Sequence, residues 1–294
     1  KTFFPAIYGS YNLKKNKFSL IGGIRYTRNE ASAIFNDTLL DFLSDDFEIK
    51  RHSLSVSISS YFYPNETTKI FLDLSTGFRA PNIDDLGKVF IKDQFLTVPN
   101  SQLVPEYAYN FSLGIGKKIN FNNIQFSFSS TSFFTILDNV ITKQSLEING
   151  SSLIYYDSNY YEILANQNNA FGIVYGLSGS LSITFFKNLK VHSSLCYTSG
   201  ILEKEEIPMS HIPPLFGKLN LNYIFKKFEF QILNNFNAEK SNKLFGQGNT
   251  DNPLEASPMG YPSWWVINTQ VGYQYKESLK LSLGLYNLLD VHYK

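Results

Sequence analysis

The chain has 294 residues, and its 26 Lys and Arg against 25 Asp and Glu leave a formal net charge of +1. This balance excludes a polybasic nucleic-acid-binding protein and an acidic tail. Charged residues make up only 17% of the chain and aromatic residues 16%, whereas soluble domains have roughly 25% charged residues. The composition therefore indicates a surface that meets something other than water, or that is solvated by groups other than charges.

Cysteine and histidine are too sparse for a metal centre. The single cysteine, Cys196, excludes a disulfide framework and a cysteine cluster. The four histidines lie far apart without metal-ligand spacing, so we expect neither a metal site nor a cofactor. No run of about 18 apolar residues predicts a transmembrane helix. The first residue, Lys1, follows no signal sequence, which suggests a processed or partial chain.

The dominant pattern is alternation of apolar and small polar residues with a period of two. In segment 53–60, Leu54, Val56 and Ile58 alternate with Ser, and in segment 279–286 every second residue is Leu. Such alternation predicts half-buried strands, and we therefore expect an all-β protein. Cutting the chain at turn signals gives about twelve strands, near 2–14, 17–30, 48–63, 67–80, 105–119, 122–144, 154–186, 188–200, 213–226, 227–240, 262–275 and 279–292.

The connections between these strands alternate strictly between short turns and long loops. The long loops run through about 31–47, 81–104, 145–153, 201–212 and 241–261. Long strands joined by short turns at one end and long loops at the other are typical of a transmembrane antiparallel β-barrel. Lipid offers no partners to backbone N–H and C=O groups, so a sheet that spans a membrane has to close on itself.

Four motifs follow one another between residue 74 and the end of the sequence. The first pairs Gly77-Phe78-Arg79-Ala80-Pro81 with Val98-Pro99-Asn100 and Leu103-Val104-Pro105-Glu106, on either side of the loop at 81–104. The others are the strand 133–141, the segment Ile212-Pro-Pro-Leu-Phe-Gly217, and Leu285-Tyr-Asn-Leu-Leu-Asp290 with Tyr293. In this order they closely resemble the signature of TonB-dependent outer-membrane receptors, over residues 74–294.

The resemblance implies a barrel of 22 strands closed by an N-terminal plug, in the outer membrane of a Gram-negative bacterium. Residues 1–294 would be a partial barrel domain, approximately strands 10–21, with the plug and the last strand outside this chain. The implied function is active transport rather than catalysis: binding of a scarce nutrient, most often an iron–siderophore or similar chelate, and import with energy from TonB. Its partners would be outer-membrane lipid, the TonB complex through the unseen plug, and the small-molecule ligand. A surface lipoprotein partner stays open, and no nucleic acid is expected.

The motif residues are interpreted first as structural. This group comprises Phe78, Arg79, Ala80, Pro81, Pro99, Asn100, Pro105, Glu106, Asn287 and Asp290. Arg79 is also a ligand candidate, because with Glu106 it flanks the base of the loop at 81–104. Further ligand candidates are aromatic or basic residues near loop tips: Tyr155, Tyr156, Tyr160, Tyr161, His211 and Phe245, followed by Tyr261, Trp264 and Trp265. For the aromatic residues, an interfacial girdle is the alternative role.

Several alternatives are weighed against the leading function. Heme receptors similar to this family commonly carry a histidine between the first two motif parts, and none occurs between Pro81 and Pro99. A calcium site is a weaker interpretation than a solvated loop for two acidic groups. These are the pair Asp84 and Asp85 and the triplet Glu203, Glu205 and Glu206. A passive porin or receptor partner remains an alternative. An outer-membrane phospholipase would need a histidine and a serine on the outer wall, for which His192 with Ser194 is the nearest match.

Overall fold

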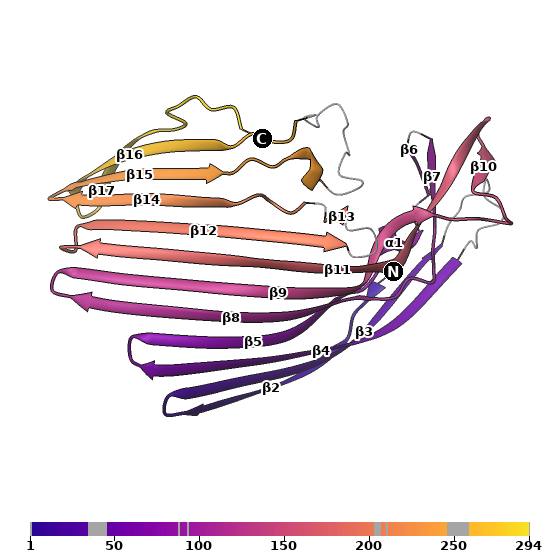
Figure 1. Cartoon of the computed structure of the whole chain (residues 1–294), viewed down its shortest axis with the longest axis horizontal. Coiled ribbons are helices and arrows are strands. Elements are labelled where there is room, and N and C mark those ends of the chain that lie inside the picture. The colour runs from indigo at the N-terminus through magenta and orange to yellow at the C-terminus, as the bar shows by residue number, and fades with distance from the viewer. Residues whose placement is uncertain are drawn as a thin grey trace.

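We analysed a computed structural model of the chain, which describes residues 2–34, 46–87, 89–92, 94–202, 207–209, 211–245 and 259–293. They form one strongly curved β-sheet in which twelve long strands lie side by side in chain order (Figure 1). A smaller group of elements projects from one end of the sheet, where the long loops gather. None of the described helices has the length and apolar character needed to cross a membrane.

The twelve long strands match the predicted ones closely. They are β2 (Ala6–Lys15), β3 (Phe18–Ile34), β4 (Asp46–Asn65), β5 (Thr68–Arg79), β8 (Glu106–Phe121), β9 (Ile124–Ser145), β11 (Asn159–Phe185), β12 (Leu189–Leu202), β14 (Phe216–Phe225), β15 (Phe228–Asn237), β16 (Trp264–Lys276) and β17 (Leu279–Leu285). The remaining elements are short: β1 (Thr2–Phe3), β6 (Phe90–Lys92), β7 (Phe95–Val98), β10 (Leu153–Tyr156), β13 (Ile207–Pro208), α1 (Ile83–Gly87) and the 3₁₀-helix η1 (Asn242–Leu244).

Each long strand pairs antiparallel with the next one along the chain. The short turns use left-handed backbone, for example at Asn16 with φ 48° and Asn122 with φ 49°. Asparagine tolerates this conformation better than most residues, which is why these turns can be so tight. Strands β2 and β17 are the two edges, and no pairing of described residues joins them. The all-β antiparallel prediction is confirmed, and the sheet is open.

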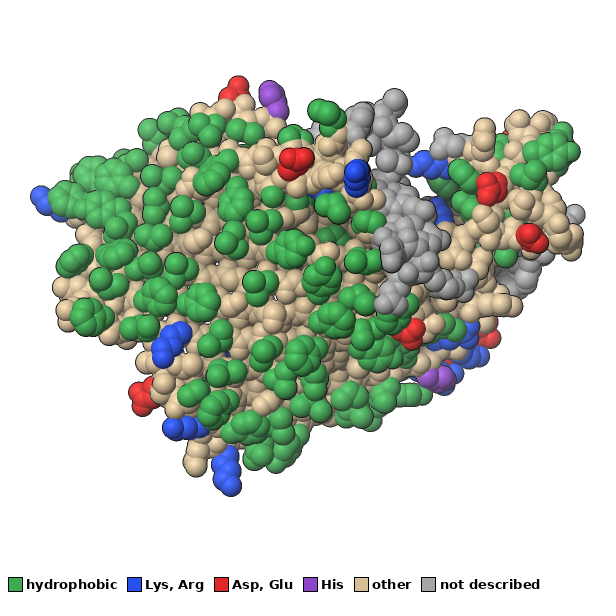
Figure 2. Space-filling view, in the orientation of Figure 1, with side chains coloured by type: hydrophobic (Ala, Val, Ile, Leu, Met, Phe, Trp, Pro, Cys, Tyr) green, Lys and Arg blue, Asp and Glu red, His purple; other side chains and the backbone are tan. Residues whose placement is uncertain are grey.

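The outer face of the sheet is apolar. One row across five neighbouring strands consists of residues in register, each about two-fifths exposed: Ile58, Leu74, Phe111, Phe134 and Tyr175. Figure 2 shows hydrophobic side chains spread over one whole face of the sheet, with charges confined to its margins. In water such a surface would be costly, because each exposed apolar Å² loses about 25 cal/mol relative to burial. A lipid environment removes that cost.

The inner face carries small polar side chains and glycine. Hydroxyl and amide groups bridge neighbouring strands there, as in Ser129–Ser180 at 2.7 Å and Thr135–Asn110 at 3.0 Å. Aromatic rings fill the gaps over glycine: a Cβ at Gly176 would lie 2.5 Å from the Phe133 ring. The absence of a side chain at Gly176 therefore leaves room for the ring from the neighbouring strand.

The projecting elements form a folded unit that we call the cap, made of residues 80–105 and 145–165. In it β7 pairs in parallel with the first part of β11, and β6 and β10 flank this pair. Leu96, Val98, Ile163 and Ala165 are buried between these strands. Leu86 of α1 and Leu103 are buried against Ala31 of β3 and Ile49 of β4. The cap has its own apolar core and is held against the sheet.

Two predicted strands, 154–186 and 279–292, differ from the observed ones for local reasons. The strand predicted at 154–186 is broken by a turn at Asp157 and Ser158, whose φ angles are 43° and 66°. The strand predicted at 279–292 ends at Leu285, because Asn287 and Asp290 turn the chain with φ 51° and 48°. The predicted loop at 81–104 contains α1, β6 and β7 rather than irregular chain alone. Most of the predicted loop at 31–47 lies outside the described residues.

Candidate functional site

Arg79, at the end of β5, is the centre of an ionic network at the base of the cap. Its Nε donates to Glu106, the residue opposite it in β8, and its Nη1 donates to Asp85 at 2.6 Å. The two carboxylate side chains are each 17% exposed, whereas that of Arg79 is 47% exposed. The second oxygen of Glu106 accepts the backbone N–H of Ile141 in β9 at 2.7 Å.

The start of helix α1 places Asp85 toward Arg79. Asn82 caps the helix by accepting the N–H of Asp85 at 2.8 Å, and Asp85 accepts the N–H of Asn82 at 2.9 Å in return. This reciprocal arrangement satisfies the free N–H groups of the first helical turn. One carboxylate therefore serves both the helix cap and Arg79.

Amide side chains tie the rest of the loop to the sheet. Asn100 donates to the backbone oxygen of Asn166 in β11 at 2.7 Å, and Asn166 donates to the backbone oxygen of Asp85 at 2.9 Å. Asn168 bonds both backbone groups of Val104 at 2.8 and 2.9 Å. The family-motif residues Pro81 and Pro105 are buried nearby, and Phe78 lies against Tyr107 with ring centroids 6.4 Å apart. Ala80 and Pro99 are half-buried.

The four candidate tyrosines separate onto the two faces of the β10–β11 hairpin. Tyr155 and Tyr160 lie opposite each other with ring centroids 5.1 Å apart and are 62% and 70% exposed. Tyr161 lies on the other face and packs against the buried core of the cap. Tyr156 is half-buried. Only the first pair presents its rings outward.

The candidates of the later loops form a second small cluster. The rings of Phe245 and Tyr261 are in tilted contact with centroids 5.1 Å apart, and the Lys240 amine lies 5.6 Å from the Phe245 ring. Lys240 is buried and donates to the backbone oxygen of Ile212 at 2.5 Å. Burial lowers the pKa of the Lys240 amine below its ordinary value. His211 is exposed, with left-handed backbone at φ 61°.

The acidic loop residues do not form one site. Asp85 is held by Arg79, whereas the neighbouring Asp84 is exposed. Glu203, Glu205 and Glu206 lie outside the described residues. In the part of the chain that the structure describes, no three His, Cys, Asp or Glu side chains come together in a way that could hold a metal ion.

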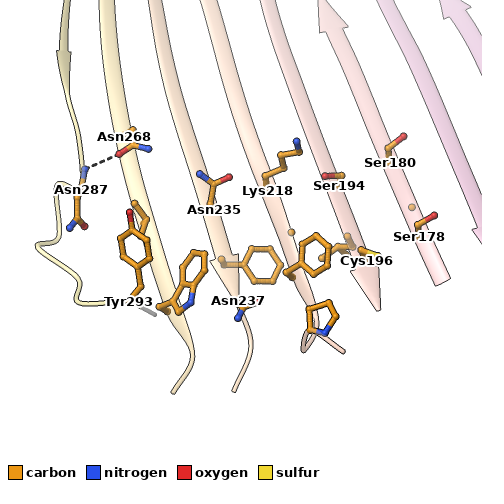
Figure 3. Close-up of a pocket in the computed structure, with 18 of the residues that line it drawn as sticks. Ser178, Ser180, Ser194, Cys196, Lys218, Asn235, Asn237, Asn268, Asn287 and Tyr293 are labelled. Carbon is orange, nitrogen blue, oxygen red and sulfur yellow. Dashed lines mark hydrogen bonds between the residues drawn. The ribbon is translucent and has the colours of Figure 1, made fainter. Parts of the chain in front are cut away.

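A concave pocket of about 960 Å³ lies on the inner face, spanning β9 to β16 (Figure 3). We call this surface the wall. Figure 3 shows its polar side chains projecting from neighbouring strands toward the pocket. The lining comprises Ser129, Thr131, Ser178, Gly179, Ser180, Ser194, Leu195, Cys196, Pro213, Phe216, Gly217, Lys218, Asn235, Phe236, Asn237, Trp264, Val266, Asn268, Tyr286, Asn287 and Tyr293.

The last described residues fold back over one side of this pocket. The N–H of Asn287 donates to the Asn268 side chain of β16 at 2.8 Å, as the dashed line in Figure 3 marks. The Asn287 side chain bonds both backbone groups of Val291, and the N–H of Asp290 donates to the backbone oxygen of Asn287 at 2.9 Å. These bonds bring Tyr293 to the Trp264 ring, with centroids 5.2 Å apart.

Trp264 and Trp265 point to opposite faces of β16. Trp264 lines the pocket, and Trp265 lies on the outer face, stacked on Phe236 with centroids 5.6 Å apart. Trp265 Nε1 donates to Asn234 at 3.4 Å. The wall as a whole was missed from sequence; small polar residues at alternate positions of consecutive strands were its only signal.

The sequence family described as TonB dependent receptor-like, beta-barrel matches residues 2–288. The chain belongs to the TonB-dependent receptor family. This is a family of outer-membrane receptors and transporters of Gram-negative bacteria, not of enzymes. The family resemblance drawn from the four motifs is therefore confirmed.

Solved structures of this kind share the fold of the chain. They include the copper transporter OprC, with 16% identity and a TM-score of 0.73 over 98% of this chain and 43% of that one. The FrpB iron transporter from Neisseria meningitidis has 13% identity and a TM-score of 0.73 over 99% and 42%. The ferric-catecholate import receptor Fiu from E. coli has 15% identity and a TM-score of 0.69 over 99% and 41%.

The chain thus spans less than half the length of each of these receptors. A search of curated proteins gave no match. The enzyme alternative is set aside by the family. The geometry agrees, because His192 lies on the inner face, where its ring nitrogen is 2.8 Å from the Ser182 hydroxyl, and not on the outer wall.

Proposed function

We propose that this TonB-dependent receptor chain is the greater part of the barrel of an outer-membrane active-transport receptor. It would bind a scarce nutrient, most often an iron–siderophore or similar chelate, on its extracellular side and import it with energy from TonB. The observation that carries the proposal is that a cap with its own apolar core and a concave polar wall belong to one sheet whose outer face is apolar. A ligand site is expected where a concave surface opens beside ordered loops.

The twelve long strands correspond, in this proposal, to strands 10–21 of a barrel of 22. The inner face of the sheet would then surround an unseen plug, through which the TonB complex would act. The open edges β2 and β17 support this assignment, since unpaired strand edges are not stable in lipid.

The proposal is tested in the bacterium that makes the protein, with the full-length gene. Deletion should abolish uptake of the receptor's chelate under iron limitation, and deletion of TonB should abolish it equally. Fractionation should place the protein in the outer membrane. A passive porin is the second candidate, and uptake that persists without TonB would favour it and overturn active transport.

A further inference from the structure

The wall has a charge composition unlike that of the cap. Among its lining residues, Lys218 is the one side chain of the Asp, Glu, Lys, Arg and His types. Lys218 is exposed and stands in register between Ser194 and Asn235. A ligand seated here would thus meet one positive charge from these strands.

The polar part of the lining consists of neutral amides and hydroxyls. Asn235, Asn237 and Asn268 present side chains that both donate and accept hydrogen bonds. Ser178, Ser180 and Ser194 add hydroxyl groups from β11 and β12. Figure 3 shows the labelled serines on β11 and β12 and the labelled asparagines on β15 and β16, with Lys218 of β14 between them. Such groups match uncharged oxygen atoms on a ligand, which need both donors and acceptors.

Aromatic rings border these groups at the extracellular end. Phe216 is 40% exposed, and Trp264 and Tyr293 are in ring contact with each other. The Trp264 indole N–H is buried and has no hydrogen-bond partner among the described residues. A buried donor without an acceptor is energetically unfavourable. An acceptor brought by another molecule or protein segment would remove that cost.

We propose that the wall binds an uncharged, oxygen-rich organic ligand that has C–H faces for stacking on the rings. This inference rests on the proposed function and narrows its ligand class. A multiply charged anion would lose its hydration beside neutral groups and find one cation, and an uncompensated buried charge is strongly unfavourable. A neutral molecule exchanges water for amide and hydroxyl partners at little cost. Two sources have this chemistry: a neutral ferric trihydroxamate and an oligosaccharide.

The test is calorimetric binding to the full-length receptor in detergent micelles. The probes are ferrichrome, a neutral ferric trihydroxamate; maltoheptaose, an oligosaccharide; and ferric enterobactin, a multiply anionic ferric catecholate. We expect one of the two neutral probes to bind at least about tenfold more tightly than the anionic one. The neutral probe that binds identifies the source of the ligand.

Two neighbouring tryptophans supply a matched pair of variants. Trp264→Ala should weaken binding of the neutral probe about tenfold. Trp264→Phe keeps a ring for stacking but lacks the indole N–H, so it should restore part of the binding. Trp265→Ala, on the opposite face of the same strand, should change the affinity by less than about twofold. The Phe variant keeps the comparison valid if the Ala variant folds poorly.

Three results would overturn the inference. The first is tighter binding of ferric enterobactin than of either neutral probe, and the second is binding of none of the three probes. The third is that wild type, Trp264→Phe and Trp264→Ala bind the neutral probe with equal affinity. Failure of the proposed function is read separately, from uptake that does not depend on TonB. Tight binding of ferric enterobactin with TonB-dependent uptake would thus refute the neutral ligand and leave the transport proposal intact.

Discussion

The cap and the wall belong to the same curved sheet, yet most of their polar groups have opposite roles. At the base of the cap, Arg79 bonds both Asp85 and Glu106, and each carboxylate also accepts a backbone N–H group. Leu86 and Leu103 of the cap are buried. In the wall, Lys218 and Asn235 stand exposed on an open concave surface.

The difference separates structure from recognition. Polar groups that are bonded within the chain hold a loop in place, and little of their bonding capacity is left for a ligand. Groups that line a concave surface without covering one another keep that capacity for something else. The prominent motif of this sequence therefore builds the support, and the less conspicuous residues offer the binding surface.

The largest effect is expected from the core beneath the cap. Leu103→Ala removes a side chain that is 1% exposed and should destabilise the cap by about 2–5 kcal/mol, through lost burial and the cavity left behind. Hydrogen exchange of the full-length protein should show faster exchange across residues 82–104, with β14–β16 unchanged. Equal acceleration in both regions would show that cap and wall are one cooperative unit.

The next largest loss of stability is expected from a substitution of Gly176, on the inner face. In Gly176→Ala the new Cβ would lie 2.3 Å from the Tyr197 backbone oxygen and 2.5 Å from the Phe133 ring, so the strands have to shift. We expect a loss of about 1–3 kcal/mol in thermal or denaturant unfolding of the full-length barrel. The matched control is Gly22→Ala, since nothing lies within 4 Å of its Cβ position. Similar losses in the two variants would contradict the close contact.

The ionic network around Arg79 should contribute less to stability than the Leu103 side chain or the close packing at Gly176. Arg79→Met leaves Asp85 and Glu106 without their cation, and we expect a loss of about 1–2 kcal/mol, reduced by the 47% exposure of the Arg79 side chain. Limited proteolysis of the full-length protein should then cut more readily between residues 82 and 104. Lys50→Met is the control, because its exposed pair with Glu48 is worth less than about 1 kcal/mol. Unchanged proteolysis in the Arg79 variant would mean that the apolar core alone holds the cap.

The smallest change in stability is expected on the wall itself. Asn235→Ala removes an exposed amide and should alter the free energy of unfolding by less than about 0.5 kcal/mol. The same variant should weaken binding of the neutral probe, so stability and affinity separate at this residue. A stability loss comparable to that of Arg79→Met would show that the Asn235 amide, too, is bonded within the chain.

Much of the fold could be predicted from periodicity. The alternation of Leu54, Val56 and Ile58 with serine recurs along the chain, and each repeat became a strand in the expected order. Failures fell where local backbone chemistry overrides alternation. Asp157 with Ser158, and Asn287 with Asp290, adopt left-handed conformations and stop strands that the apolar pattern would have continued.

The candidate site was predicted in part. The sequence predicts the pair of Arg79 and Glu106, because the two residues flank one loop. It does not predict that Asp85 joins them, because the direction of the Asp85 side chain depends on the helix cap at Asn82. The exposure of Tyr155 and Tyr160, and the burial of Tyr161, follow from a hairpin register that a local pattern does not contain.

The sequence by itself determined which side chains alternate, where the turns are tight, and to which receptor family the chain belongs, because these depend on near neighbours and on short motifs. Only the tertiary structure decided the register between neighbouring strands, and thus that Ser180, Ser194, Lys218, Asn235 and Trp264 meet around one pocket. The physical reason is register. Residues dozens of positions apart become neighbours through backbone hydrogen bonds between strands, and a shift of one residue in a strand would turn its side chains to the apolar outer face.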